Sequence, residues 1–569
     1  MNGAATLKRN ASRSSDRLLP LLLLPVAVIA LGPVLRLFAE AIGQGGLDPL
    51  AHVTEVLGRD STRIALGHSL FTAGLGTVIS ILIGGGFAFL VALTDIRAKA
   101  LLVFCLMIPM MIPPQITALA WTQVTGPSSV LLKSIGLAPP LGSPQPLHSA
   151  WGIALLLGIQ HASIVFLTLR AGLRMIPADL VEAARMSGAR GLKVWAQVVV
   201  PLSLPSLAAG AAMAFVTALG NFGITAMLGI PARYSTLPTL IYQRLAGMGP
   251  SVLPEVAVLS ILIGAVAITG VLVNRLLLRR RAYGLVGLAS RPLALRLRSA
   301  RLPVEIALWA LIVAILFLPL AALIATSLVP AYGVPLTFAN ATLDAWHEAL
   351  FRQPVTARAY ANSIRLALGA AVVLMAISVP LAWAMQRGPS RLSRVADTLV
   401  DLPYALPGIV LAIACILLFI DLPFTDATLY GTVWIIFAAY LARFLVVMLR
   451  PVQASLSQMD PAMEEAAQAA GAGLARRLRT IVLPLTAPAA AAGAILVFLT
   501  AVNELTVSAL LWSAGTETLG VVIFNLDDSG ETVMASAVAT SIVIAVIFLM
   551  ALVQLGAARL PKGCVPWQN

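Results

Sequence analysis

Long hydrophobic segments, separated by short polar stretches, occupy most of this chain. A helix of roughly 20 apolar residues is long enough to cross the hydrocarbon core of a bilayer. Twelve segments reach about that length: 18–41, 66–93, 101–124, 150–170, 203–229, 253–278, 303–329, 363–386, 397–420, 429–449, 486–512 and 535–558. With 59% hydrophobic and 11% charged residues, the chain has too little polar surface for a soluble globule. The pattern predicts an all-α integral membrane protein with about twelve transmembrane helices.

Basic residues mark the expected orientation of these spans. If the N-terminus lies inside, 29 of the 38 Lys and Arg residues fall on inside segments, an excess typical of the cytoplasmic side. We therefore expect both termini in the cytoplasm. The net charge of +14 could suggest nucleic acid, but the positive residues stand at the ends of apolar segments. We therefore attribute the positive charge to orientation in the lipid bilayer and expect no nucleic-acid partner.

The N-terminal residues 1–17 are polar and basic and precede an apolar run, Leu18 to Leu37. Such an arrangement could be a signal peptide. The apolar run is long and no small-x-small cleavage site follows it, so we interpret it as an uncleaved first span.

One polar stretch occurs twice, and the two copies lie 283 positions apart. The first reads EAARMSGARGLKVWAQVVVP from Glu182, and the second reads EAAQAAGAGLARRLRTIVLP from Glu465. Alanine and glutamate favour helix, and glycine lets the backbone reverse, so each copy predicts two short helices joined by a turn. The shared positions are Glu182, Ala183, Ala184, Gly188 and Pro201, and Glu465, Ala466, Ala467, Gly471 and Pro484. A connector lying on the membrane surface is the alternative for a single copy.

The rest of the two halves is related as well. His68-Ser69 corresponds to Asn362-Ser363 at an offset of 294, and TALGNFGITAML (217–228) corresponds to TAVNELTVSALL (500–511). Six spans per half return the chain to the same side, so this is a parallel duplication. The expected regions are a basic cytoplasmic tail (1–17), a first half (18–274), a basic cytoplasmic linker (275–302), a second half (303–558) and a C-terminal cytoplasmic tail (559–569).

Polar residues inside apolar segments are costly and are therefore candidates for function. Glu504 is the only acidic residue in its segment, Asn503 precedes it, and Asn221 is the counterpart of Glu504. All three are expected near the outer ends of their spans. They are candidates for a transport pathway or gate, and the alternative is a hydrogen bond between packed helices.

Two proline pairs open corresponding apolar segments: Pro109 with Pro113, and Pro403 with Pro407. Proline removes a backbone donor, which favours a broken or re-entrant span where protein covers the backbone. Kinked packing of a continuous span is the alternative.

The sequence shows no pattern of catalytic residues. It lacks a GxxxxGK[ST] phosphate loop and an HExxH motif, and its three cysteines and five histidines are scattered. We expect no catalytic, cofactor or metal site in this chain, and ATP must be hydrolysed elsewhere.

The duplicated stretch resembles the EAA loop of binding-protein-dependent ABC importer permeases, whose pattern is E-A-A-x3-G-x9-I-x-L-P. The second copy matches every fixed position, while the first has Val198 for Ile and Val200 for Leu. Segments such as LPYALPGIVLA (402–412) and NELTVSALLWSAGTETLGVVIF (503–524) resemble the fused two-domain permeases of the ferric-iron, thiamine and 2-aminoethylphosphonate importers. The resemblance covers most of 65–274 and 360–555.

This resemblance implies two type I ABC importer transmembrane domains in the bacterial inner membrane. It implies a periplasmic solute-binding protein and two copies of a cytoplasmic ATPase, which carry ATP and Mg and bind the loops around Glu182 and Glu465. Ferric iron is the first expectation for the solute. The alternatives are a secondary transporter driven by an ion gradient and, with less support from the paired loops, a membrane scaffold.

Overall fold

The computed structural model describes residues 2–43, 50–188, 192–247, 252–279, 296–388, 390–421 and 427–556. These residues form helices and no β-strand. The helices of the N-terminal half are α1 (Asn2–Gly43), α2 (Ala51–Gly58), α3 (Asp60–Ser80), α4 (Gly86–Leu93), α5 (Lys99–Met111), α6 (Pro114–Val124), α7 (Val130–Ser134), α8 (Ala150–Arg174), α9 (Ala178–Met186), α10 (Leu192–Val194), α11 (Val200–Leu219), α12 (Gly223–Gly229), α13 (Leu237–Leu245) and α14 (Val252–Arg279).

The C-terminal half repeats this succession. Its helices are α15 (Arg301–Ile312), α16 (Leu318–Ser327), α17 (Asp344–His347), α18 (Pro354–Arg387), α19 (Ser390–Ala405), α20 (Gly408–Phe419), α21 (Val433–Ser457), α22 (Pro461–Ala469), α23 (Leu474–Arg477), α24 (Leu483–Val502), α25 (Ser508–Leu511), α26 (Leu519–Asp528) and α27 (Thr532–Gly556). Most of the predicted linker and all of the predicted C-terminal tail lie outside the described residues.

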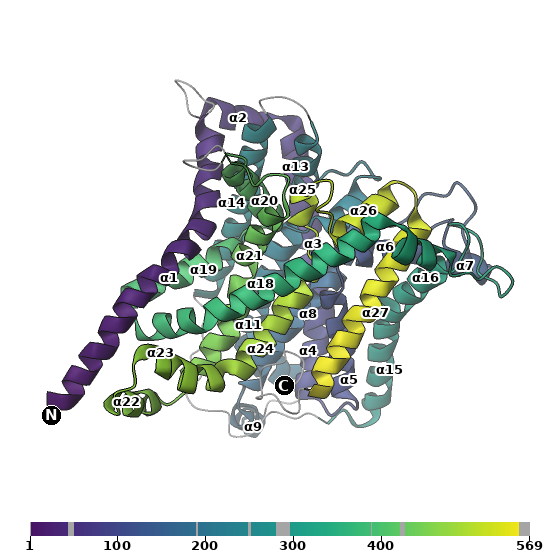
Figure 1. Cartoon of the computed structure of the whole chain (residues 1–569). Coiled ribbons are helices and arrows are strands. Elements are labelled where there is room, and N and C mark those ends of the chain that lie inside the picture. Colours follow the sequence, from purple (N-terminus) through teal and green to yellow (C-terminus); the bar gives the residue numbers. More distant parts are fainter. Residues whose placement is uncertain are drawn as a thin grey trace.

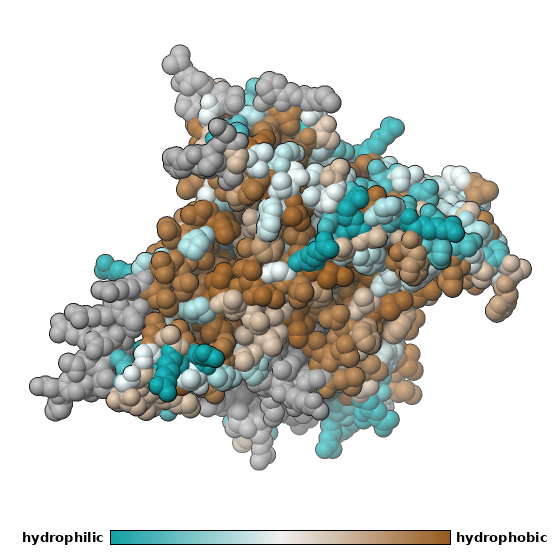
Figure 2. Space-filling model, viewed as in Figure 1, coloured by the Kyte–Doolittle hydropathy of each residue, from teal (hydrophilic) through white to brown (hydrophobic). Residues whose placement is uncertain are grey.

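Ten helical segments among the described residues are long and apolar enough to cross a membrane, and two sharply bent helix pairs bring the total to as many as twelve. The prediction of about twelve spans in two halves is confirmed. Figure 2 shows hydrophobic surface across the middle of the visible face, with hydrophilic side chains gathered above and below it. A bilayer fits this arrangement, because lipid covers an apolar belt while both polar ends remain in water.

The bent pairs lie where the proline pairs predict them. The α5 and α6 axes meet at 104°, and those of α19 and α20 meet at 105°. Pro113 has no N–H to donate to the carbonyl of Pro109, so a straight helix would leave that carbonyl unpaired. The side-chain amide of Gln160 on α8 replaces the missing donor, with Nε2 2.8 Å from the Pro109 carbonyl oxygen and 3.0 Å from that of Ile112. The prediction of broken spans is therefore confirmed.

Prolines also explain a second recurring irregularity. Four of the five π-helical turns in the described chain end two residues before a proline: Trp195–Val199, Val313–Phe317, Glu348–Arg352 and Leu478–Val482. A π turn bonds i to i+5 and so widens the backbone where the proline cannot donate to its i−4 carbonyl. The first and last of these turns precede Pro201 and Pro484, the closing residues of the duplicated stretch. The duplication thus extends to the local backbone.

Each half is built around three packed helices: α3, α8 and α11 in the first, and α18, α21 and α24 in the second. The first helix of each half packs largely on the other half. Helix α1 lies against α18, α19 and α20, as its course along one side of Figure 1 shows, and α16 lies against α6 and α7. Each of these helices also contacts the last helix of its own half, α14 or α27. The halves are therefore interlocked through α1 and α16.

Candidate functional site: the paired loops and the interface between the halves

The first duplicated loop places its motif residues at the molecular surface. In α9, Glu182 and Ala183 are exposed and Ala184 is half-buried, while Val181 is fully buried. Gly188 follows α9 with φ = +87°, a left-handed backbone conformation that strongly favours glycine. Residues 189–191 lie outside the described residues, and the chain continues in α10 with the buried Val194. Buried valines therefore hold this loop from both sides of its turn.

The second loop has the same backbone course. The Asp460 side chain accepts a hydrogen bond from the backbone N–H of Ala462 and so caps α22, whose N-terminus would otherwise leave that donor free. Glu465 and Ala466 are exposed, Ala467 is half-buried, and Gly471 has φ = +80°. In Figure 1, α9 and α22 lie at the same end of the molecule. Two equivalent helices thus expose a glutamate at one end.

A different glutamate anchors the second loop. Glu464 is 3% exposed and accepts a hydrogen bond from Trp383 Nε1 at 2.8 Å, and its other oxygen lies 3.1 Å from Arg387 Nη2. The buried Arg477 donates from Nη1 to Gln468 Oε1 at 3.2 Å. The first loop has valines, Val181 and Val194, where the second has Glu464 and Arg477. The two loops are therefore anchored by different chemistry.

The predicted spans 203–229 and 486–512 are too long at their outer ends. Helices α11 and α24 end at Leu219 and Val502, and the chain then turns into the short helices α12 and α25. Gly220 stands at this break, and it allows close approach of the other half, because a Cβ there would lie 2.8 Å from Cβ of Pro407. Asn221, Asn503 and Glu504 therefore follow the ends of spans and do not lie within them.

These three side chains have distinct contacts. Asn221 Oδ1 accepts from the backbone N–H of Ile224 at 3.0 Å, and Glu504 Oε1 accepts from that of Val507 at 3.0 Å. Both residues thus support the start of a short helix. Glu504 also lies 3.5 Å from Arg443 on α21. Asn503 instead connects the halves, since its Nδ2 donates to the Met111 carbonyl oxygen at 2.9 Å.

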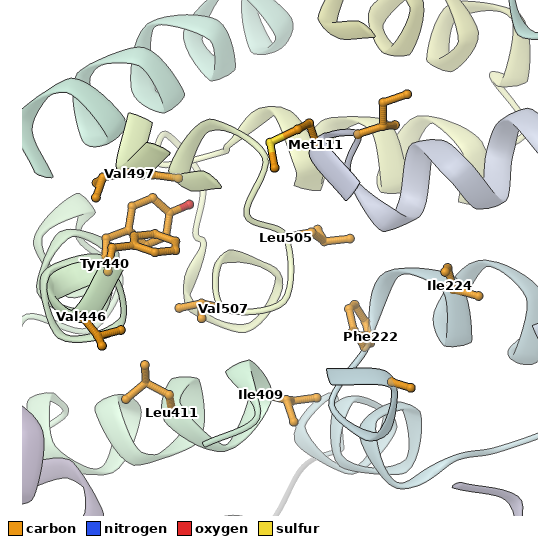
Figure 3. Packing of buried hydrophobic residues seen from close by; sticks show 14 of the residues in the cluster. Met111, Phe222, Ile224, Ile409, Leu411, Tyr440, Val446, Val497, Leu505 and Val507 are labelled. Carbon is orange, nitrogen blue, oxygen red and sulfur yellow. The ribbon is translucent and has the colours of Figure 1, made fainter. Parts of the chain in front are cut away.

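Apolar side chains close the interface between the halves around this point. Figure 3 shows Phe222 and Leu505, which occupy equivalent positions in the two halves, pointing into the same central region. Both are buried. The Phe222 ring also contacts the rings of Tyr242 and Phe524, with centroids 5.0 and 6.0 Å apart. Because Phe524 belongs to the second half, these aromatic contacts link the two halves.

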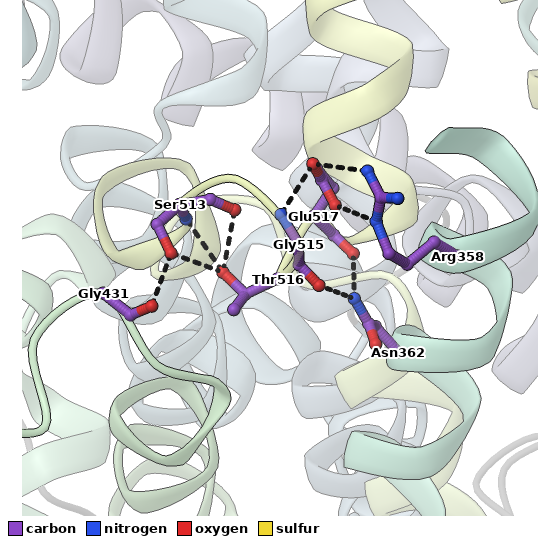
Figure 4. Close-up of polar contacts among 7 residues, drawn as sticks. All are labelled: Arg358, Asn362, Gly431, Ser513, Gly515, Thr516 and Glu517. Carbon is purple, nitrogen blue, oxygen red and sulfur yellow. Dashed lines mark hydrogen bonds and ion pairs between the residues drawn. The ribbon is translucent and has the colours of Figure 1, made fainter. Parts of the chain in front are cut away.

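A polar cluster fastens a loop of the second half. Arg358 forms hydrogen bonds with both carboxylate oxygens of Glu517, at 2.9 and 3.1 Å, and Asn362 donates to the carbonyl oxygens of Gly515 and Glu517 (Figure 4). The hydrogen bond from Arg358 is the main cause that lowers the pKa of Glu517 to about 2. At the counterpart of Asn362, the His68 ring stacks on Tyr234 with centroids 3.7 Å apart. His68 Nδ1 also lies 2.9 Å from the Ser235 carbonyl oxygen, so both duplicated residues contact the backbone of their loop, and the stacked ring is the contact that differs.

Sequence reasoning missed four residues that the structure singles out. The 29 basic residues on the expected inside segments include Arg443, which instead lies within α21 and pairs with Glu504. Its place inside the apolar segment 429–449 was the available signal. Glu464 and Trp383 could not be paired from sequence, and no motif or repeat pointed to Gln115. No group of three or more His, Cys, Asp or Glu residues that could hold a metal occurs in the described part of the chain.

The fold and these loops define a membrane protein with two interlocked, duplicated halves. The family model for the binding-protein-dependent transport system inner membrane component matches residues 65–281 and again 375–562. The chain therefore belongs to this family of ABC transporter permeases, in the fused form with both transmembrane domains in one polypeptide. Membership of an ABC transporter family sets aside the alternative of ion-gradient-driven transport. This chain is the permease component, and the ATPase is a separate subunit.

Individual relatives agree with this assignment. A probable ABC transporter permease, y4fN of Sinorhizobium fredii, is 27% identical over 95% of each chain. The ferric transport system permease FbpB of Actinobacillus pleuropneumoniae is 23% identical over 93% of this chain and 77% of its own length. A putative 2-aminoethylphosphonate transport permease, PhnU of Salmonella choleraesuis, is 29% identical over 40% of this chain and 79% of its own length. Their names span different solutes.

Proposed function

We propose that this permease imports a small solute along the interface between its halves, from a periplasmic binding protein to the cytoplasm. One copy of an ATPase would bind each of the helices α9 and α22. The observation that carries this proposal is the pair of exposed glutamates, Glu182 and Glu465, on equivalent helices at one end of the molecule, each followed by a glycine with positive φ.

The loops can transmit force only if the ATPase contacts them differently in its open and closed states, because a conformational change requires a difference in interaction free energy. Glu182 with Ala183 and Ala184, and Glu465 with Ala466 and Ala467, would form the contact surfaces. Gly188 and Gly471 would set the angle at which each helix meets the ATPase. A Cβ at either glycine would have open space around it, so the constraint on these positions is the left-handed backbone and not crowding.

The test replaces these glycines. We expect Gly188→Asp and Gly471→Asp each to reduce uptake and co-purification of the ATPase, and the double variant to reduce both further, with unchanged abundance in the membrane. Glu182→Ala and Glu465→Ala should each have a smaller effect, because one exposed ion pair contributes about 0–1 kcal/mol. Normal uptake by the double glycine variant would overturn the coupling role.

Orientation is tested by reporter fusions. A reporter after Gly142, in the loop before α8, should lie on the periplasmic side. One after Arg291, which is outside the described residues, should lie in the cytoplasm together with both termini. Reporters on the same side would contradict the proposed topology of twelve spans in two parallel halves.

Ferric iron is the first candidate for the solute. Similarity over 93% of this chain to a relative named as a ferric transport permease supports it, and the match over 40% of this chain to the 2-aminoethylphosphonate permease makes that solute the second candidate. Calorimetric titration of the purified binding protein with ferric iron, 2-aminoethylphosphonate and thiamine would decide between them. Binding of either organic solute without iron would overturn the first choice.

A further inference from the structure

Gln115, the second residue of α6, is a polar side chain without a polar neighbour to bond. It is fully buried, and neither Oε1 nor Nε2 has a hydrogen-bond partner among the described residues. A buried amide that makes no hydrogen bond destabilises the conformation that buries it. The closed interface therefore contains a group that would gain hydrogen bonds if the interface opened.

This amide lies between the two halves. A Cβ at Gly223 of the first half would be 3.2 Å from Gln115 Oε1, and a Cβ at Gly520 of the second half would be 3.1 Å from Gln115 Nε2. The same point at Gly520 is 3.1 Å from Cβ of Leu505, one of the two central apolar residues. Glycines on both sides let the two backbones approach the amide closely. Gln115 thus adjoins the region that must separate for a solute to pass.

A second amide stands at the same corner. Asn503 uses Nδ2 to bind the carbonyl of Met111, the last residue of α5, but its Oδ1 is buried without a partner in the described chain. Met111 and Gln115 flank the sharp bend between α5 and α6. The bend therefore carries two unpaired carbonyl oxygens and one unpaired NH₂ group.

The equivalent corner of the other half lacks these two amides. Ile409 stands at the counterpart of Gln115, and Gly220, packed against Pro407, at that of Asn503. Figure 3 shows Ile409 beside Phe222 in the central region. Arg443 Nη1, buried without a hydrogen-bond partner in the described chain, lies 3.0 Å from where a Cβ at Gly408 would be. This corner therefore presents a cation, whereas the corner at Gln115 presents neutral amide groups.

We propose that Gln115 and Asn503 form a neutral hydrogen-bonding site that the transported solute contacts when the halves part. This inference rests on the proposed pathway between the halves. Two carbonyl acceptors and one amide donor suit a solute that presents hydroxyl, amine or bound-water groups. The neutral site belongs to one corner, because the other corner carries the Arg443 guanidinium.

The first experiment uses Gln115→Met, which keeps the length of the side chain and removes its polar atoms. The purified chain should unfold at a higher temperature than wild type, because the unpaired amide is gone, while ATP-driven uptake falls about fivefold or more for want of the contact. The matched control is Gln123→Met on the same helix. Gln123 is equally buried and its Oε1 is likewise unpaired among the described residues, but its Nε2 donates to Ser536 Oγ at 3.0 Å. Its variant loses this hydrogen bond and should not gain the stability expected of Gln115→Met.

A lower unfolding temperature for Gln115→Met, or unchanged uptake, would overturn the inference, because a purely structural glutamine stabilises the fold and does not contact the solute. If Gln115→Met and wild type transport equally, the proposed function survives and only this site is lost. If the wild-type permease shows no ATP-driven uptake with its ATPase and binding protein, the proposed function itself fails.

The second experiment measures access to the site. Gln115→Cys is introduced into a chain whose native Cys105, Cys415 and Cys564 are alanine, and the complex with its ATPase is treated with a small methanethiosulfonate reagent. We expect labelling in either the nucleotide-free or the ATP-vanadate state, with protection in the other. Equal labelling in both states, or none in either, would contradict a contact that forms when the halves part.

Discussion

The two duplicated loops have the same backbone but are held by opposite kinds of contact. In the first, Val181 and Val194 are buried at the positions flanking the turn; in the second, Glu464 and Arg477 take these places. The surroundings changed together with the anchors, since the counterparts of Trp383 and Arg387 are Phe89 and Leu93. The duplication has thus kept the exposed glutamate and the turn glycine, while the buried contacts diverged as sets.

A second pair of equivalent positions shows the same divergence. Arg450 on α21 lies 3.0 Å from Asp397 and also pairs with Asp401. Its counterpart Arg170 is buried, with its guanidinium 5.6 Å from the centre of the Phe166 ring, and Val103 and Met107 replace the two aspartates. An aromatic face can replace a carboxylate because its quadrupole also attracts a cation. The halves are therefore equivalent in shape and different in their polar contacts.

The largest expected effect comes from placing the anchor of one loop in the other. Val181→Glu would bury a carboxylate at a fully buried site of the half in which Phe89 and Leu93 stand in place of Trp383 and Arg387. We expect a loss of roughly 3–5 kcal/mol in the free energy of unfolding, as for an unpaired buried charge. Thermal unfolding of the solubilised chain measures it, with Val181→Leu as control. Adding Phe89→Trp and Leu93→Arg should restore part of the lost stability. If it restores none, the buried anchor and its surrounding residues do not act together.

Removing the native anchor should have the next largest effect. Glu464→Ala leaves the buried Trp383 N–H without its acceptor and should cost about 3 kcal/mol in the free energy of unfolding. Glu464→Gln should cost less, since an amide oxygen can still accept from Trp383. The neighbouring exposed Glu465→Ala is the matched control and should leave the unfolding temperature unchanged. Equal shifts for Glu464→Ala and Glu465→Ala would refute the anchoring role.

The contribution of Glu517 to stability should depend on pH, because acid protonates its carboxylate. The His68–Tyr234 stack at the equivalent position contains no carboxylate. Because its folded pKa of about 2 lies below the ordinary value of 4.5, the Glu517 carboxylate contributes stability above pH 4.5 that is lost as the pH falls toward 2. The unfolding temperature should therefore drop between pH 5 and pH 3 more in the wild type than in Glu517→Gln. Parallel curves for the two proteins would show that this carboxylate contributes nothing.

The smallest effect is expected at Arg450. Its side chain is 43% exposed, and those of Asp397 and Asp401 are 46% and 52% exposed, so solvent screens both ion pairs. The double variant Asp397→Asn, Asp401→Asn should change the free energy of unfolding by about 0–1 kcal/mol. By comparison, Phe166→Leu should reduce stability more, because it removes a buried ring and its contact with Arg170. A larger loss of stability in the double Asn variant than in Phe166→Leu would show that the acidic pairs stabilise the fold more than the Phe166–Arg170 contact does.

Hydrophobic length, proline spacing and the offset between repeats were sufficient to predict the spans, the two halves and the broken helices. They did not locate the ends of α11 and α24, because the short helices α12 and α25 that follow are themselves apolar and prolong the hydrophobic segments. The interlocking of α1 and α16 was also hidden, since a helix that faces lipid and one that faces another apolar helix have similar compositions. Finally, only the fold distinguishes Glu464 from its neighbour Glu465, because the motif names the exposed residue and not the anchor.

The interlocking of the halves has a consequence for biosynthesis. Helix α16 is synthesised after α6 and α7, the helices of the other half on which it packs, so these partners are already present when α16 emerges. Helix α1 is synthesised before its partners in the second half. The first of these, α18, begins at Pro354, 311 residues after α1 ends at Gly43. At 5–20 residues per second, α1 waits for about 15–60 s before the ribosome has produced its partner. During that interval lipid or the insertion machinery must cover the face that α18 to α20 will later occupy.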